Sequence, residues 1–234
     1  MKTRVLSFYD WFLIAGVIVS NLIYSVLTGN VDVVGSIAGI AGVLCVVLVA
    51  KGNIWNYAFG LVNVSMYAYI SYKAALYGDA ALNALYYLPM QFIGWWQWRR
   101  RGAALSDASS AGEGMQVRAR RFTPAGRMWL FLGCALAVVA GGYILRYVGD
   151  PQPFKDSATT VLSVVAQVLM ALAFMEQWIL WIINNIIEVV MWCICISRGD
   201  AHAEVMVIMW VFYLLNSVNG FRVWLNLSSR DIRR

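Results

Sequence analysis

Long apolar stretches follow one another along almost the whole chain, separated by short polar segments. They do not alternate polar with apolar positions and are too long for the strands of a membrane barrel, so they predict helices. A helix that crosses a bilayer needs about 20 mostly apolar residues. The sequence therefore predicts eight spans, at residues 11–31, 33–50, 52–72, 80–98, 128–145, 157–175, 177–197 and 205–221.

The first span follows Lys2 and Arg4, as the apolar region of a secretory signal peptide does. Its apolar run is longer than such a region, however, and the Leu27-Thr28-Gly29-Asn30 that follows is not an Ala-x-Ala-like cleavage site. We therefore expect residues 1–30 to contain a retained helix.

The composition agrees with a membrane protein. Of the 234 residues, 61% are hydrophobic and 13% are charged, and the mean hydropathy is +0.66. A soluble domain has about half apolar and about a quarter charged residues. These values exclude a disordered chain, a disulfide scaffold and an ordinary soluble enzyme, and they favour an all-α integral membrane protein.

Lys and Arg residues gather on one side of the predicted spans. With the N-terminus in the cytoplasm, thirteen of them lie inside and four outside, and Arg222 lies near the inner end of the last helix. By the positive-inside rule, both termini are expected in the cytoplasm. Residues 99–127, which contain seven arginines, are expected to form a flexible cytoplasmic loop, and residues 228–234 a cytoplasmic tail. Topology and contact with anionic membrane lipid explain the net charge of +6, so we expect no nucleic-acid partner.

The sequence lacks the residue groups of a metal centre and the common catalytic motifs. The four cysteines lie in apolar stretches without CxxC spacing, and the single histidine, His202, has no companion ligands. There is no phosphate-binding loop, HExxH motif or GxSxG motif. We therefore expect no cofactor, no metal and no catalytic residue.

A weak internal repeat relates two groups of three spans. Three pairs of matching positions support it: Gly78-Asp79-Ala80 with Gly199-Asp200-Ala201, Asn63 with Asn184, and Gly94-x-x-x-Trp98 with Gly220-x-x-x-Trp224. Two three-helix units can point the same way only if one further helix joins them. The predicted architecture is thus an extra N-terminal helix (1–30), a first repeat (31–98), a linker helix (128–147) and a second repeat (156–227), an arrangement found in transporters.

Polar side chains inside the spans share helical faces with aromatic ones, at about 100° per residue. Intramembrane polar groups are costly, so such a grouping predicts a binding site. Glu188 is the only charged residue in the eight spans as bounded above. The candidate substrate-binding residues are Asn63 in span 52–72, Tyr87 and Gln91 in span 80–98, Trp178, Trp181, Asn184, Asn185, Glu188 and Trp192 in span 177–197, and Asn216 and Asn219 in span 205–221.

These residue types suit a small, flat, polar ligand. Aromatic faces stack on a ring and attract a cation, while amides and a carboxylate bind hydroxyl and amide groups. Structural alternatives stay open for some of them. An interfacial aromatic belt would also explain Trp95, Trp96 and Trp98, and it explains Trp55 more clearly. Hydrogen bonds that join helices would also explain Asn56 and Asn63.

The pattern Trp178-x-x-Trp181-x-x-Asn184-Asn185 with Glu188 resembles the PnuC family of bacterial nicotinamide riboside transporters. Gln91 with the following Gly94-Trp95-Trp96-Gln97-Trp98, and the helix start at Asn53-Ile54-Trp55-Asn56-Tyr57, are similar to that family as well. The resemblance covers residues 31–226, so the N-terminal helix is an addition to the family's seven-helix core.

The resemblance implies a fold like that of the SWEET sugar transporters and uptake of nicotinamide riboside across the bacterial inner membrane for NAD synthesis. It further implies facilitated diffusion, trapping of the substrate by a cytoplasmic riboside kinase, and a homo-oligomer, with a trimer suggested. Relatives that carry other flat vitamins leave thiamine and riboflavin open as substrates. The alternatives from other functional classes are an integral-membrane enzyme and a scaffold protein. For an enzyme, the sequence lacks a nucleophile or a metal cluster. For a scaffold protein, a buried Glu188 would have no purpose.

Overall fold

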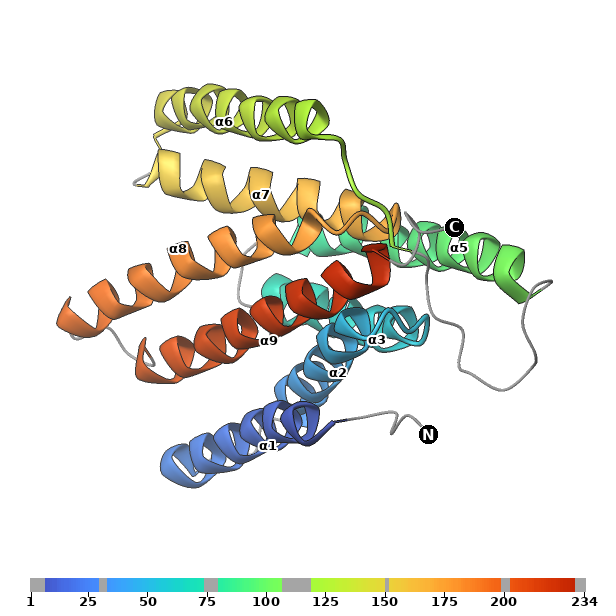
Figure 1. Cartoon of the computed structure of the whole chain (residues 1–234). Helices are drawn as coiled ribbons and strands as arrows, with labels where there is room; N and C mark the ends of the chain where they lie inside the picture. Colours follow the sequence, from blue (N-terminus) through green and yellow to red (C-terminus); the bar gives the residue numbers. More distant parts are fainter. Residues whose placement is uncertain are drawn as a thin grey trace. The chain divides into compact units, whose positions relative to one another are not determined.

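The computed structural model describes residues 7–29, 33–73, 80–106, 119–149, 152–198 and 203–229 (Figure 1). Within them, a π-helical segment, η1 (Leu82–Tyr87), runs directly into α5, so that nine helical elements make eight rods. The helices are α1 (Phe8–Thr28), α2 (Val33–Ala50), α3 (Asn56–Lys73), α5 (Leu88–Ser106), α6 (Pro124–Tyr147), α7 (Pro153–Ala171), α8 (Gln177–Arg198) and α9 (Ala203–Ser229). The expectation of an all-helical chain with eight helices is confirmed.

Several helix boundaries differ from those expected, and two of the differences have a clear local cause. Helix α5 continues past residue 98 to Ser106, so Arg99, Arg100 and Arg101 extend a helix instead of opening a loop. Arginine is a good helix former, and the arginine run therefore does not stop the helix. Helix α3 begins at Asn56 and not at residue 52, because residues 51–55 form a tight corner after α2.

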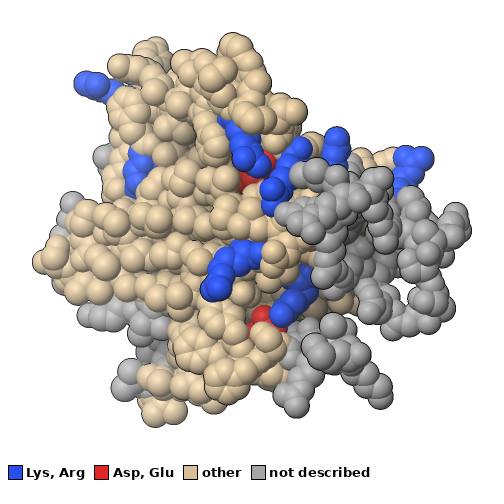
Figure 2. Space-filling view, viewed as in Figure 1, with Lys and Arg blue, Asp and Glu red and all other residues tan. Residues whose placement is uncertain are grey.

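Among the described helices, α2 and α6 are each long and apolar enough to cross a bilayer, and shorter apolar stretches cover Phe8–Ser20 and Gln177–Met191. Large apolar side chains are exposed along α6, including Leu132, Leu136 and Ile144. Most of the described surface in Figure 2 is neither acidic nor basic. Such a surface suits contact with lipid.

The chain divides into two compact units, Met1–Val117 and Arg118–Arg234. In the first, α1 contacts α2, α2 contacts α3, and α3 contacts both η1 and α5. In the second, α6 contacts α7, α7 contacts α8, and α8 contacts α9. Each unit is thus a sequence of four helical rods in which every helix packs on the one before it.

A tight corner joins α2 to α3 in the first unit, and a corner of the same geometry joins α7 to α8 in the second. Gly52 has a φ of 66° in the first corner, and Ala173 has a φ of 59° in the second. Gly52 donates its backbone N–H to Val49 O at 2.9 Å, as Ala173 does to Met170 O at 3.0 Å. Both corners are therefore helix ends with a left-handed residue, a conformation that costs a residue other than glycine about 1–2 kcal/mol.

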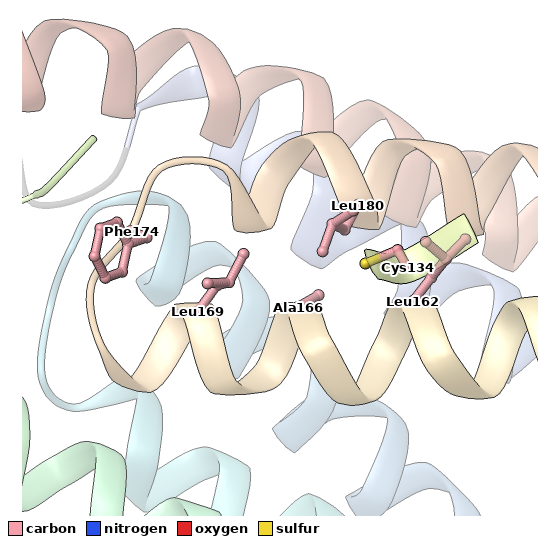
Figure 3. Close-up of a cluster of buried hydrophobic side chains, with 6 residues drawn as sticks. All are labelled: Cys134, Leu162, Ala166, Leu169, Phe174 and Leu180. Carbon is pink, nitrogen blue, oxygen red and sulfur yellow. The ribbon is translucent and has the colours of Figure 1, made fainter. Parts of the chain in front are cut away.

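The apolar core of the second unit joins three helices and this corner. Figure 3 shows its buried members: Cys134 from α6, Leu162, Ala166 and Leu169 from α7, Phe174 from the corner and Leu180 from α8. The ring of Phe122, which lies just before α6, stacks on Phe174 with 4.1 Å between the ring centroids. Helix α8, which carries most of the candidate site residues, is thereby held on α7.

Candidate substrate-binding site

Trp178, at the start of α8, is a packing residue between α8 and α9. Its side chain is 2% exposed and meets Trp224 edge to face, with 6.1 Å between the ring centroids. Gly220 gives it room, because a Cβ atom there would lie 2.5 Å from the indole. The indole Nε1–H is buried, and it donates no hydrogen bond to any described residue.

The same contact recurs in the first unit with other side chains. Tyr57 at the start of α3 meets Trp98 of α5 edge to face at 5.1 Å, and Gly94 leaves the space that the tyrosine ring fills. Trp98 is 1% exposed. The expectation that Trp98 could belong to an interfacial belt is therefore wrong, whereas Trp96 is half exposed and keeps that possibility.

Trp181 has different neighbours. It is partly buried and packs against the core formed by α6, α7 and α8. Trp178 and Trp181 are expected on one helical arc, and the structure covers them with different neighbours: Trp178 meets Trp224 and Gly220 of α9, and Trp181 packs against the core residues of α6 and α7. The cause is that α8 packs between α7 and α9.

The polar residues of α8 lie in different surroundings. Asn185 is 3% exposed and donates from Nδ2 to Ser217 Oγ of α9 at 2.8 Å, and Ser217 donates to Tyr213 O. Asn184 is 4% exposed, and its Oδ1 accepts no hydrogen bond from any described residue. Glu188 is partly buried. The side chain of Trp192 lies outside the described part of the structure.

Helix α9 contributes Asn216, which is buried, and Asn219, which is partly buried. In the first unit, Asn63 of α3 donates from Nδ2 to Ala38 O of α2 at 2.8 Å. This bond gives Asn63 the helix-joining role that was its structural alternative.

Gln91 is the most deeply buried of the first unit's candidate residues. It is 5% exposed and donates from Nε2 to the carbonyl oxygen of Tyr87 at 3.1 Å, while its Oε1 accepts no hydrogen bond in the described structure. Gln91 also lines a groove of about 560 Å³ on the first unit, which includes Trp55, Tyr57, Phe92, Trp95 and Arg99. Tyr87 is partly buried and meets Tyr86 edge to face.

Two deep carboxylates escaped the sequence analysis, which counted only Glu188. Glu176 is fully buried, and its Oε1 accepts from Arg127 Nε at 2.8 Å and from Phe122 N at 3.1 Å. Asp10 is fully buried and pairs with Lys51 at 2.7 Å. Glu176 is the single residue between two predicted spans, and a charge in that place is normally a sign that a span has ended. A gap of one residue is too short for a loop that reaches water, and this is the signal that the corner is buried.

Gln177 was also missed. It is fully buried, and neither its Oε1 nor its Nε2 has a hydrogen-bond partner among the described residues. Asn56 holds the equivalent place at the start of α3, is fully buried as well, and donates from Nδ2 to Asn53 O at 2.7 Å. The repeat offset that relates Asn63 to Asn184 also relates Asn56 to Gln177, which is the signal that could have found it.

In the described ranges, no group of three His, Cys, Asp or Glu residues could hold a metal ion. The candidate residues are instead amides, aromatic rings and one carboxylate, which can bind a ligand by stacking, hydrogen bonds and charge.

Residues 32–226 match a family described as Nicotinamide mononucleotide transporter. The chain belongs to this family. The match covers α2 to α5, the linker helix α6 and α7 to nearly the end of α9, and it leaves out the N-terminal helix α1, as the resemblance implied. The family is one of membrane transporters, so the alternative of an integral-membrane enzyme falls away.

Similar proteins agree with this membership. The chain is 42% identical over 197 residues to the nicotinamide riboside transporter PnuC of Neisseria mucosa, covering 83% of this chain and 73% of that one. It is 34% identical to the PnuC of Haemophilus influenzae, covering 83% and 80% of the two chains. A crystal structure of the vitamin B3 transporter PnuC has a TM-score of 0.74 and 35% identity, with 96% of this chain and 94% of that one covered.

Proposed function

We propose that this chain carries nicotinamide riboside across the bacterial inner membrane. The relatives that bear the name of this substrate support the proposal. The observation that carries it is the pair of buried amide oxygens, Gln91 Oε1 and Asn184 Oδ1, which accept no hydrogen bond in the described structure. A buried acceptor without a partner costs about 1–3 kcal/mol, and the ligand's carboxamide and hydroxyl groups are donors that would remove this cost.

The residues proposed to bind the substrate are Gln91 and Tyr87 in the first unit, and Trp181, Asn184, Glu188, Asn216 and Asn219 in the second. Trp181 would stack on the pyridinium ring, and Glu188 would balance its positive charge. Asn185 and Asn63 would act mainly through the hydrogen bonds that join their helices, and Trp178 through its packing against Gly220.

Glu188 also favours the riboside over the mononucleotide that the family's description names. A phosphate group would bring negative charge to a site that holds a carboxylate, and like charges in a poorly solvated site repel each other strongly. Thiamine is the second candidate substrate, because it is also a flat cation, and riboflavin is the third.

Transport is proposed to be uniport, with phosphorylation by a cytoplasmic riboside kinase as the source of net uptake. Glu188, the carboxylate on the candidate site's face, is assigned here to the cationic ligand, so it is unavailable as a proton carrier. The other two deep carboxylates are held in ion pairs with Lys51 and Arg127.

The proposed architecture is an N-terminal helix followed by a SWEET-like arrangement of three, one and three helices, with both termini in the cytoplasm. The matching corners at Gly52 and Ala173, and the matching contacts of Tyr57 and Trp178 with a glycine and a tryptophan, support the repeat. A homo-oligomer, with a trimer suggested, belongs to the same proposal. A cysteine introduced at Ser109 should resist an impermeant thiol reagent in intact cells; ready labelling would contradict the orientation.

The substrate is tested by binding to the purified full chain. Thermal stabilisation or calorimetry with nicotinamide riboside, nicotinamide mononucleotide, thiamine and riboflavin should rank the riboside first. Stronger binding of thiamine or riboflavin would show that the proposed substrate is wrong, although the chain would still be a transporter. Stronger binding of the mononucleotide would contradict the role given to Glu188.

A further inference from the structure

A groove on the first unit remains outside the proposed transport site, apart from its deep end at Gln91. Its outer part is lined by Trp55 at the corner and by Phe92, Trp95 and Arg99 on α5. These three ring-bearing side chains are 66%, 55% and 45% exposed, respectively. In a membrane protein such a surface faces lipid unless another chain covers it.

The cationic end of this groove has no acidic partner in the described structure. The guanidinium of Arg99 lies 5.4 Å from the centroid of the Trp95 ring, which is its one recorded interaction among the described residues. The contact keeps the charge beside the groove without neutralising it. By contrast, the buried cations at the corners, Lys51 and Arg127, each meet a carboxylate.

Exposed aromatic rings next to a cation on the same helix match the two parts of an anionic phospholipid. Acyl chains would lie along Phe92 and Trp95, and the phosphate would meet Arg99. We propose that this groove is a binding site for an anionic phospholipid of the inner leaflet, with Arg99 as the residue that selects the headgroup charge.

Arg100 provides a matched control on the same turn of α5. Its guanidinium stacks on Trp96 at 4.5 Å, so it has the same charge and the same kind of ring contact, but it does not line the groove. General attraction to an anionic surface contributes about 1 kcal/mol per basic residue and acts on both arginines alike. A built site would depend on Arg99 far more than on Arg100.

The test uses the full chain in detergent, titrated with phosphatidylglycerol or phosphatidylcholine and followed by native mass spectrometry. Phosphatidylglycerol should bind at least about tenfold more tightly than phosphatidylcholine. Arg99→Gln should remove most of that preference, whereas Arg100→Gln should reduce it by about fivefold or less, the equivalent of about 1 kcal/mol. Binding of nicotinamide riboside should stay unchanged in both variants, which shows that they are folded and separates this inference from the proposed function.

A second measurement locates the lipid. Phosphatidylglycerol with brominated acyl chains should quench the tryptophan fluorescence of the native chain. The quenched fraction should fall clearly in Trp95→Phe, and it should fall less in Trp96→Phe. Equal effects of Arg99→Gln and Arg100→Gln, or equal affinity for the two lipids, would overturn the proposal. So would an oligomer in which the groove excludes brominated lipid, because a second copy would then be its occupant.

Discussion

Arg127 and Glu176 hold the start of α6 on the corner that leads into α8, with 2.8 Å between Nε and Oε1. In the first unit, Asp10 near the start of α1 meets Lys51 in the corner that leads into α3, at 2.7 Å. In the first unit the helix carries the acid and the corner carries the base, whereas in the second unit the helix carries the base and the corner the acid. In each unit, an ion pair therefore joins the first helix to the corner between the next two helices. The N-terminal helix α1 has the same place in the first unit as the linker helix α6 has in the second.

The Arg127–Glu176 pair gives an asymmetric prediction for stability. Glu176 is fully buried, whereas the Arg127 side chain is 37% exposed. Arg127→Gln leaves a buried charge without its partner and should lower stability more than Glu176→Gln, at the lower end of about 3–5 kcal/mol because the site is partly solvated. The double variant should recover part of the loss. Thermal unfolding in detergent measures the effect.

The control for this prediction is Asp156→Asn. Asp156 pairs with its neighbour Lys155 at 2.7 Å, and both side chains are partly exposed. Its loss should change stability by no more than about 1 kcal/mol. Equal costs for Asp156→Asn and Arg127→Gln would show that burial does not set the strength of these pairs.

Close packing of Trp178 on Gly220 predicts the effect of one methyl group. Gly220→Ala should lower stability by about 1–3 kcal/mol, because the added carbon would overlap the indole. Gly133→Ala, in the middle of α6, is the matched control: a Cβ atom there meets nothing within 4 Å, and alanine favours a helix by up to about 1 kcal/mol. Thermal unfolding of the two variants should therefore shift in opposite directions. If Gly220→Ala left the thermal stability unchanged, the close contact between Trp178 and Gly220 would be contradicted.

The neighbours Asn184 and Asn185 should differ in what their removal changes. Asn185→Ala removes the hydrogen bond to Ser217 and should cost about 1 kcal/mol of stability. Asn184→Ala removes an amide oxygen without a described partner, so stability should hold while affinity for nicotinamide riboside falls by about fivefold or more, as for one lost hydrogen bond. If Asn184→Ala destabilised the chain and left affinity intact, the assignment of Asn184 to the ligand would be wrong.

Glu188→Gln keeps the shape of the side chain and removes its charge. Affinity for the cationic riboside should fall by about 1–3 kcal/mol, the range for hydrogen bonds to charged groups. The reduced riboside, whose ring is uncharged, is the matched ligand and should lose much less. Calorimetry with both ligands separates the charge from the hydrogen bond, and equal losses would refute a role for Glu188 in balancing the cation.

Much of the fold could be predicted from the sequence, because apolar stretches of this length leave helices as the structures that satisfy every backbone hydrogen bond in lipid. Each of the eight helical rods begins within a few residues of its expected start, whereas α5 and α9 extend well beyond their expected ends. The difference at α5 arises because the arginine run predicts a loop by its charge, although arginine is a good helix former.

The site was less predictable, for a reason that Trp178 illustrates. Helical spacing places Trp178 and Trp181 near the polar residues of α8, but it does not say which neighbouring helix covers each ring. Only the packing reveals that Gly220 leaves a space for Trp178 and that Trp181 meets the α6–α7 side. Glu176 was missed for a related reason: a charge between two apolar stretches suggests a loop in water, whereas the folded corner buries it against Arg127.

The most direct test of the account is uptake of labelled nicotinamide riboside into sealed proteoliposomes that contain the full chain and no kinase. The membrane voltage is held at zero, because a cationic substrate responds to voltage even in a uniporter. With or without a proton or sodium gradient, the internal concentration should rise to the external one and stop there, and enclosed kinase with ATP should then drive further uptake. Accumulation above the external concentration without kinase, driven by either gradient and abolished when that gradient is collapsed, would contradict uniport.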